Sequence, residues 1–174
     1  MRWIWIDKFE KFEPGVVAVA LKNVSLAEEH LHDYVPGFPV MPASLIIEGM
    51  AQTAGILVGA ARNFQEKVIL AKISNATFSR LVRPGEQIVY TARIANVNET
   101  GASIEGVVTV RTRVAGGGDG TSQLVEEPVG TIAMMFSHID QNMAGLKFPE
   151  FNFVFNSQFM ELFETYRWDF QIKL

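Results

Sequence analysis

The chain has 174 residues, of which 48% are hydrophobic and 20% charged, and its net charge is −4 at pH 7. This length suits one domain around a single core, and the acidic balance gives no support for nucleic-acid binding, which needs a basic surface. The absence of cysteine excludes disulfides, thiolate nucleophiles and cysteine-ligated metals, and the three histidines lack a zinc-like spacing, so we expect no metal site. The first apolar run, residues 3–6, is too short for a signal peptide, and we expect a cytoplasmic protein.

Two strands and a proline-rich loop are predicted in the first 42 residues. Residues 3–6 and 16–21 have the apolar, β-branched character of strands. Residues 22–41 look irregular, because three prolines at three-residue spacing, the last of them Pro42, cannot form a helix interior. We therefore predict an ordered, stiffened loop that leads into the next element.

A long apolar helix is predicted after this loop. From Ala43 to about Arg62 hydrophobic residues cover every face, a pattern typical of a helix that is buried on all sides or spans a membrane. Gly49, Gly55 and Gly59 lower its intrinsic stability but allow other backbone to approach closely. The polar residues within it and the strand-rich remainder argue against a membrane span. We expect a helix wrapped by a sheet.

Four strands rich in Val, Ile, Thr and aromatic residues are predicted after the helix. They lie at residues 68–79, 86–97, 103–114 and 128–139. The glycine-rich residues 116–122 indicate a flexible hairpin loop. Residues 130–136 are apolar without alternation, which predicts a central strand buried on both faces. The fold class predicted by this order is α+β, with an antiparallel sheet curled around one long central helix.

The residues from 141 onward differ in character from those before them. Seven of the thirteen phenylalanines lie in residues 148–170. Phe151, Phe153 and Phe155 alternate as in a strand or an extended cover, and a helical spacing follows at Phe159, Leu162, Phe163 and Tyr166. We predict a main domain of residues 1–140 and a Phe-rich extension of residues 141–174 that packs on the domain or on a partner subunit. The alternative is a lid over an apolar tunnel.

Glu48 is the only charged residue between Asp33 and Arg62, and it lies in the middle of the predicted helix. Burying an unpaired carboxylate costs several kcal/mol, so such a group is protonated, paired or functional. A buried carboxyl group is suited to general acid–base catalysis. Catalysis by Glu48 competes here with pairing to a structural arginine such as Arg80, and with exposure on a partly solvated helix.

Residues 36–52 read PGFPVMPASLIIEGMAQ. This motif closely resembles the active-site segment of the β-hydroxyacyl-acyl-carrier-protein dehydratases of bacterial fatty acid synthesis. Further matches lie at residues 22–25, Phe78, Arg80 and residues 84–85. The resemblance covers roughly residues 3–140 and implies a hot-dog fold, a homodimer that is often assembled as a trimer of dimers, and an apolar tunnel at the dimer interface. It also implies elimination of water from a 3-hydroxyacyl thioester of acyl carrier protein or coenzyme A, giving a trans-2-enoyl thioester without a cofactor.

The resemblance extends to individual residues of the site. Glu48 matches the family's catalytic acid, Gln52 matches the glutamine one helical turn later, and Gly37 matches the glycine after the catalytic histidine. Tyr34 occupies the position of that histidine, and Ala43 replaces a glycine whose N–H faces the thioester carbonyl. The N–H remains at a helix N-terminus, where it would stabilise a developing enolate oxygen. Gly37, Ala43 and Gln52 are therefore expected to bind substrate.

Three hypotheses address the missing histidine. In the first, His32 replaces the base, since an extended loop would place it on the same face as Tyr34. In the second, Glu48 moves the proton alone and Tyr34, whose phenol is a poor base at neutral pH, hydrogen-bonds the substrate. In the third, the protein binds acyl chains or acyl carrier protein without dehydrating them. His30 is expected at the surface, and His138 is expected to be structural or exposed.

Two further function classes stay open. One is a hot-dog thioesterase that uses the helix carboxylate for hydrolysis, and the other is a non-catalytic subunit whose partner supplies the histidine. The proline-rich motif favours the dehydratase. Arg80 and Arg83, together with Arg62 and Lys67, are candidates for docking an acidic carrier protein, although solvated surface charges explain them equally well.

Overall fold

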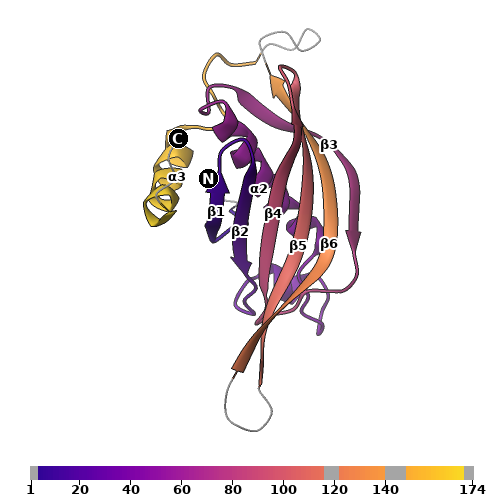
Figure 1. Cartoon of the computed structure of the whole chain (residues 1–174). Helices are drawn as coiled ribbons and strands as arrows, with labels where there is room; N and C mark the ends of the chain where they lie inside the picture. Colours follow the sequence, from indigo (N-terminus) through magenta and orange to yellow (C-terminus); the bar gives the residue numbers. More distant parts are fainter. Residues whose placement is uncertain (1–3, 116–121, 140–147, 171–174) are drawn as a thin grey trace.

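A computed structural model describes residues 4–115, 122–139 and 148–170, with the backbone alone described for residues 166–170. The elements in these residues are β1 (Lys8–Glu13), β2 (Val17–Asn23), α1 (His30–Asp33), α2 (Ala43–Ala61), β3 (Lys67–Phe78), β4 (Gln87–Val97), β5 (Gly101–Ala115), β6 (Ser122–Ile139) and α3 (Ser157–Phe170). The strands form one antiparallel sheet in the order β1-β2-β4-β5-β6-β3. The sheet curls around α2 (Figure 1), which confirms the predicted α+β arrangement.

The core lies between α2 and the concave face of the sheet. Met50, Ala54 and Leu57 on α2 are fully buried, and the helix contacts β2, β3, β4, β5 and β6. At Gly49 a Cβ atom would lie 2.4 Å from the ring of the buried Tyr90, so this close approach requires glycine. The glycine thus admits a neighbouring side chain here, and the predicted close approach of other backbone is not what requires it.

One face of α2 is left uncovered by the sheet. Ser44 and Glu48 are exposed, and Gln52 and Gly55 are half-buried. Their spacing of three and four residues places them on one face of the helix. The expectation of a helix buried on every side is therefore wrong for the single chain. By length and composition α2 could also cross a membrane, but 56% of the stretch is buried inside the protein, as in a core helix.

Two strand predictions need correction. No strand forms at residues 4–6, and β1 begins at Lys8 instead, in a sequence where charged residues alternate with Phe9 and Phe12. Strand β6 begins at Ser122 rather than at residue 128, because a register shift opposite Pro128 lets the pairing continue past the proline. The predicted glycine-rich loop lies outside the described residues, apart from Ser122 itself.

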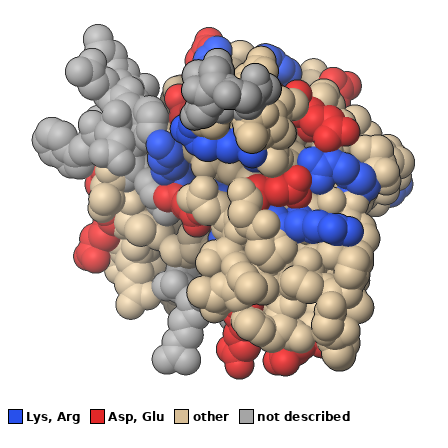
Figure 2. Space-filling view, turned by 90° about the horizontal axis from the view of Figure 1, so that it is seen from below, with Lys and Arg blue, Asp and Glu red and all other residues tan. Residues whose placement is uncertain are grey.

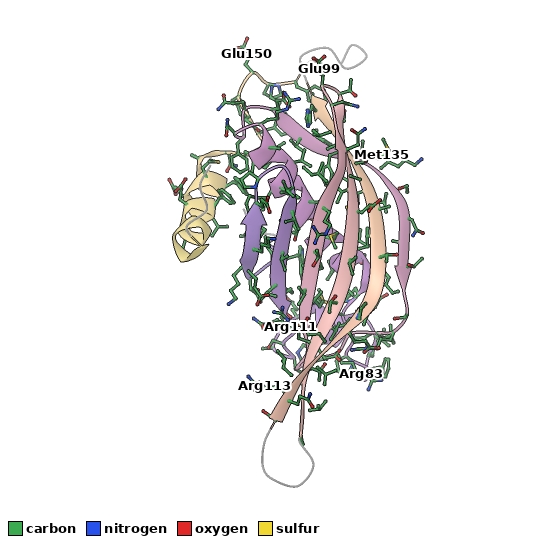
Figure 3. The ribbon with its side chains drawn as sticks, in the orientation of Figure 1. Arg83, Glu99, Arg111, Arg113, Met135 and Glu150 are labelled. Carbon is green, nitrogen blue, oxygen red and sulfur yellow. The ribbon has the colours of Figure 1, made fainter. Side chains whose placement is uncertain are left out.

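The prediction that β6 is buried on both faces is also wrong. Met134 is 1% exposed, whereas Met135 is 48% exposed on the opposite side of the strand (Figure 3). The strand is internal in the sheet, between β5 and β3, but only its concave face meets α2. The apolar outer residues therefore face solvent in the single chain.

The C-terminal helix α3 lies beside β1, outside the curl of the sheet (Figure 1). The predicted helical spacing from Phe159 to Phe163 is confirmed, while the side chain of Tyr166 lies outside the described residues. Residues 151–155 form bends rather than a strand. The Asn156 side chain accepts a hydrogen bond from the Phe159 N–H at 2.9 Å, which caps the first turn of α3.

Candidate functional site

A cavity of about 230 Å³ lies along the uncovered face of α2. The helix contributes Glu48, Ala51, Gln52, Gly55 and Ile56, which share one face because they are three or four residues apart. The N-terminal segment, β3, β6 and the C-terminal extension supply the other walls, all with apolar side chains. Of the described residues that line the cavity, Glu48 alone is ionisable. The cavity therefore places one carboxylate beside a space that suits an apolar chain.

Glu48 is held by a short chain of hydrogen bonds. Gln52 donates from Nε2 to Glu48 Oε1 at 2.9 Å, and Gln52 Oε1 accepts the backbone N–H of Trp5 at 2.8 Å. The Glu48 side chain is exposed in the single chain, so the alternative of a partly solvated helix is confirmed and that of a carboxylate buried within the domain is wrong. The cause is the uncovered face of α2. Pairing with Arg80 is also wrong, because the Arg80 guanidinium binds two other carboxylates.

The loop before α2 carries Tyr34 and Gly37 on the surface. Tyr34 is 57% exposed and follows the last residue of α1, and Gly37 has a left-handed φ of 73°. In the described part of the chain no hydrogen bond or ion pair joins Tyr34 to Glu48. The single chain thus assembles Glu48 with Gln52, and leaves the Tyr34 segment separate from them.

The helical turn α1 changes which histidine accompanies Tyr34. The prediction of an extended loop here is wrong, so His32 does not share a face with Tyr34. His32 is exposed and its Nε2 lies 2.6 Å from the carbonyl oxygen of Leu26. His30 stands one helical turn before Tyr34, and the Tyr34 N–H donates to the His30 carbonyl oxygen at 3.3 Å.

His30 is half-buried rather than fully exposed at the surface. Its ring meets the Trp5 ring edge-on at a centroid distance of 5.0 Å, and its Nε2 is buried without a hydrogen-bond partner among the described residues. The backbone N–H of Trp5 donates to Gln52 Oε1, and Gln52 Nε2 donates to Glu48. Had this segment been predicted as helical, the four-residue spacing would have placed His30 and Tyr34 on the same face.

Ala43 is the first residue of α2 and is exposed. The N–H groups of a first helical turn have no carbonyl partner within the helix, so they can face a ligand. Pro42 precedes it, and its carbonyl oxygen accepts the N–H groups of Leu45 and Ile46 at 3.0 and 3.2 Å. Ala43 and Glu48 thus lie on the same helix, with their backbone positions about 7–8 Å apart along the axis.

Comparison with known proteins assigns the chain to a family. A family model described as "FabA-like domain" matches residues 4–119. The chain belongs to the FabA-like family. The 3-hydroxyacyl-[acyl-carrier-protein] dehydratase FabZ of Hydrogenobaculum sp. (strain Y04AAS1) is 35% identical over 112 residues, which cover 63% of this chain and 76% of the relative. The protein of the same name from Coxiella burnetii (strain RSA 331) is 36% identical over 117 residues, covering 65% and 82%.

A solved structure shows the same fold at low sequence identity. The protein smu.793 from Streptococcus mutans UA159, bound to acetyl CoA, has a TM-score of 0.55 at 14% identity and covers 76% of this chain and 87% of its own. This likeness confirms the hot-dog fold. The family resemblance read from residues 36–52 is confirmed by the family match.

Arg80 and Arg83, two of the four docking candidates of this FabA-like chain, differ in how far carboxylates of the chain already neutralise their charge. Arg80 donates to Glu127 at 2.9 Å and pairs with Glu86 at 3.0 Å, so two carboxylates offset its charge. Arg83 forms no ion pair in the described part of the chain, and its guanidinium lies 5.1 Å from the centre of the Phe38 ring. Arg83 is therefore the better candidate for an acidic partner.

Arg83 lies at one end of the sheet with Arg111 and Arg113, opposite Glu99 and Glu150 (Figure 3). Figure 2 looks at this end and shows Lys and Arg side chains with Asp and Glu between them. Arg111 also binds two carboxylates. Much of the positive charge at this end is thus offset within the chain.

The Arg80–Glu86 pair predicts a pH dependence of stability. Burial alone raises the pKa of Glu86, but hydrogen bonds from the Arg80 side chain and the Arg83 N–H hold this pKa below its ordinary value of 4.5. A lowered pKa in the folded state stabilises the protein above about pH 4.5, and this contribution is lost as the pH falls further. We expect Glu86→Gln to lower the free energy of unfolding at pH 7 by about 1–3 kcal/mol.

Urea denaturation at a series of pH values measures this effect. The loss of stability on acidification below about pH 4.5 should be smaller in Glu86→Gln than in the unmodified chain. Glu99→Gln, at an exposed loop position, is the matched control and should leave the profile unchanged. Equal acid sensitivity in the Glu86 variant and the unmodified chain would show that Arg80 does not stabilise ionised Glu86.

Proposed function

We propose that this chain is a dehydratase that eliminates water from 3-hydroxyacyl thioesters to give trans-2-enoyl thioesters, with acyl carrier protein or coenzyme A as the thiol carrier. Membership of the FabA-like family and relatives at 35% and 36% identity support this reaction. The observation that carries the proposal is the position of Glu48, the one ionisable side chain among the described residues that line an apolar cavity. We further propose that it acts in the cytoplasm, in fatty acid synthesis.

The proposed mechanism uses Glu48 for both proton transfers. The Glu48 carboxylate takes a proton from C2, and the electron pair moves into the thioester carbonyl to form an enolate. The Ala43 N–H at the start of α2 stabilises the enolate oxygen. The enolate then re-forms the carbonyl and expels the C3 hydroxyl, which leaves as water after receiving the proton from Glu48. The carboxylate is restored, and no oxidant, reductant or cofactor is required.

Gln52 and Tyr34 have positioning roles in this proposal. The amide donor of Gln52 fixes Glu48 Oε1 and complements its negative charge. Tyr34 is exposed, as a group that meets substrate in the assembled enzyme must be, and its hydroxyl can donate a hydrogen bond. Gly37, in its left-handed conformation, turns the loop between Tyr34 and α2.

His32 is expected to be dispensable for catalysis. Its ring is engaged with the Leu26 carbonyl and does not share a face with Tyr34. The variant His32→Ala should keep kcat/KM within about threefold of the unmodified enzyme, since no transition-state contact is lost. Steady-state kinetics with a 3-hydroxyacyl thioester measure this ratio. A loss of about a hundredfold or more would identify His32 as the replacement base.

A homodimer is the proposed working unit. The uncovered face of α2 carries Glu48, and β3 is an edge strand whose residues 71–75 are exposed. An edge strand presents unpaired backbone groups that a second strand can bind. A second copy would cover both features at once, and would bring a Tyr34 segment from one chain toward the cavity of the other. A trimer of dimers is the larger assembly that the family resemblance implies.

A hot-dog thioesterase is the second candidate, and the replacement of histidine by Tyr34 favours it, because a lone carboxylate can also activate water. The deciding experiment incubates the purified protein with 3-hydroxyacyl-coenzyme A and with 3-hydroxyacyl-acyl carrier protein. Mass spectrometry then separates loss of water from release of the thiol. Enoyl thioester without free thiol supports the dehydratase, and free thiol without enoyl product supports the thioesterase. Absence of both products would overturn the proposed function.

A further inference from the structure

The cavity beside Glu48 has a wall that the family match does not include. The FabA-like match ends at residue 119, yet Phe155, Phe159 and Phe163 line the cavity together with the α2 residues. All three phenylalanines are buried. The C-terminal extension of this chain therefore shapes the space next to the catalytic carboxylate.

This wall is held firmly against the end of α2. The ring centres of Phe155, Phe159 and Phe163 lie 5.0, 5.8 and 5.1 Å from that of Phe64. Asn152 donates from Nδ2 to the carbonyl oxygens of Phe64 and Glu66 at 3.1 and 3.2 Å. These contacts anchor the extension where α2 gives way to β3.

Phe64 itself is fixed in an unusual conformation. Its φ of 56° lies in the left-handed region, which is costly for a bulky side chain and persists only where the surroundings impose it. At Gly59 a Cβ atom would lie 2.4 Å from Phe155 Cζ, so the Phe155 ring rests directly on the helix backbone. The wall thus meets α2 about three turns beyond Glu48.

The cavity has the size of a medium acyl chain. From Glu48 to Ile56 its helical wall spans eight residues, or about 12 Å. An apolar protein cavity of about 150 Å³ holds benzene, with its six carbons. By the same proportion the cavity of about 230 Å³ holds about nine carbons.

We propose that the C-terminal extension, through Phe155 and Phe159, closes the acyl site at the end away from Glu48 and sets its substrates as medium-chain acyl thioesters of about eight to ten carbons. The inference rests on the proposed function, because the acyl chain must start at Glu48 for the far wall to limit its length. Gly55 is the second specificity-determining position. It faces the cavity near the Ile56 end of its helical wall, where a side chain would take space from the acyl chain.

Two variants change the cavity in opposite directions. Phe159→Ala removes a ring from the wall and lengthens the space. Gly55→Ala adds a methyl group whose Cβ lies 3.4 Å from Phe136 Cε1, so it narrows the space without a clash in the core. The matched control is Phe12→Ala, since Phe12 contacts Phe163 at a ring distance of 5.6 Å but does not line the cavity.

The measurement is kcat/KM for 3-hydroxyacyl thioesters from four to sixteen carbons. Phe159→Ala should move the optimum toward longer chains and raise the ratio of long-chain to medium-chain activity at least tenfold, as one methylene in an apolar pocket already discriminates by about 10-fold or more. Gly55→Ala should move the optimum by about one or two carbons toward shorter chains. Phe12→Ala should leave the profile unchanged.

The outcomes separate this inference from the proposed function. If the enzyme is active and its chain-length profile is the same in Phe159→Ala, Gly55→Ala and the unmodified chain, the C-terminal extension does not limit the acyl chain and the inference is overturned. If no substrate turns over, the proposed function fails. Binding of saturated acyl-coenzyme A of graded length to the same variants then tests whether the C-terminal extension limits the length of the bound chain. A binding optimum that shifts as described supports it, and one that does not shift overturns it.

Discussion

Replacing Glu48 with glutamine is expected to lower kcat for dehydration by about 10²–10⁴-fold, the usual contribution of a general acid–base group. The amide keeps the size of the side chain but can neither accept the C2 proton nor deliver it to the C3 hydroxyl. KM should change little, because the apolar walls that hold the acyl chain are untouched. Single-turnover kinetics with mass-spectrometric detection of the enoyl thioester measure the chemical step directly.

Glu105→Gln is the control for this substitution. Glu105 is exposed on β5 and does not line the cavity, so its loss should leave kcat unchanged. Circular dichroism of both variants should match the unmodified chain. If Glu48→Gln retained more than about a tenth of the original kcat, another group would be the acid–base catalyst and the proposed mechanism would fail.

Truncating Phe163 to alanine is expected to lower the free energy of unfolding by about 3–5 kcal/mol, the usual cost for a buried phenylalanine. Phe163 is 1% exposed, and its ring joins those of Phe9, Phe12 and Phe64. The alanine variant leaves a cavity between α3 and β1 that the surrounding rings cannot fill. Urea denaturation followed by circular dichroism measures the difference.

Phe151→Ala provides the comparison within the same extension. Phe151 is 69% exposed, so its truncation should change the free energy of unfolding by less than about 0.5 kcal/mol. A loss of under about 1 kcal/mol in Phe163→Ala would show that α3 is not docked on β1 in solution. The wall of the cavity would then be absent as well.

The central helix and four of the strands could be predicted because their apolar patterns are long. The extent of α2 and the positions of β3, β4 and β5 agree with the predicted ranges to within about two residues. Strand β1 escaped prediction because Lys and Glu separate its two phenylalanines, so its buried face is short. The helical turn α1 was not predicted, because the prolines that follow it led us to expect an irregular loop over the whole segment.

The site was predictable where the motif is local. Glu48 and Gln52 are one helical turn apart, so their contact follows from the sequence once α2 is assigned. Exposure of Glu48 was one of several alternatives that stayed open, since apolar residues surround α2 and do not reveal which face the sheet leaves open. For the C-terminal extension, packing on the domain, packing on a partner subunit and a lid over an apolar tunnel all stayed open, because helical spacing predicts a buried face but not the surface that buries it.

A crystal structure with a bound, unreactive 3-hydroxydecanoyl amide in place of the thioester would test the account most directly. It should show the C3 hydroxyl about 2.6–3.2 Å from a Glu48 carboxylate oxygen. The acyl chain should run past Gly55 and end against Phe155. A ligand whose hydroxyl lies away from Glu48, with the chain outside this cavity, would contradict both the assigned catalyst and the assigned substrate.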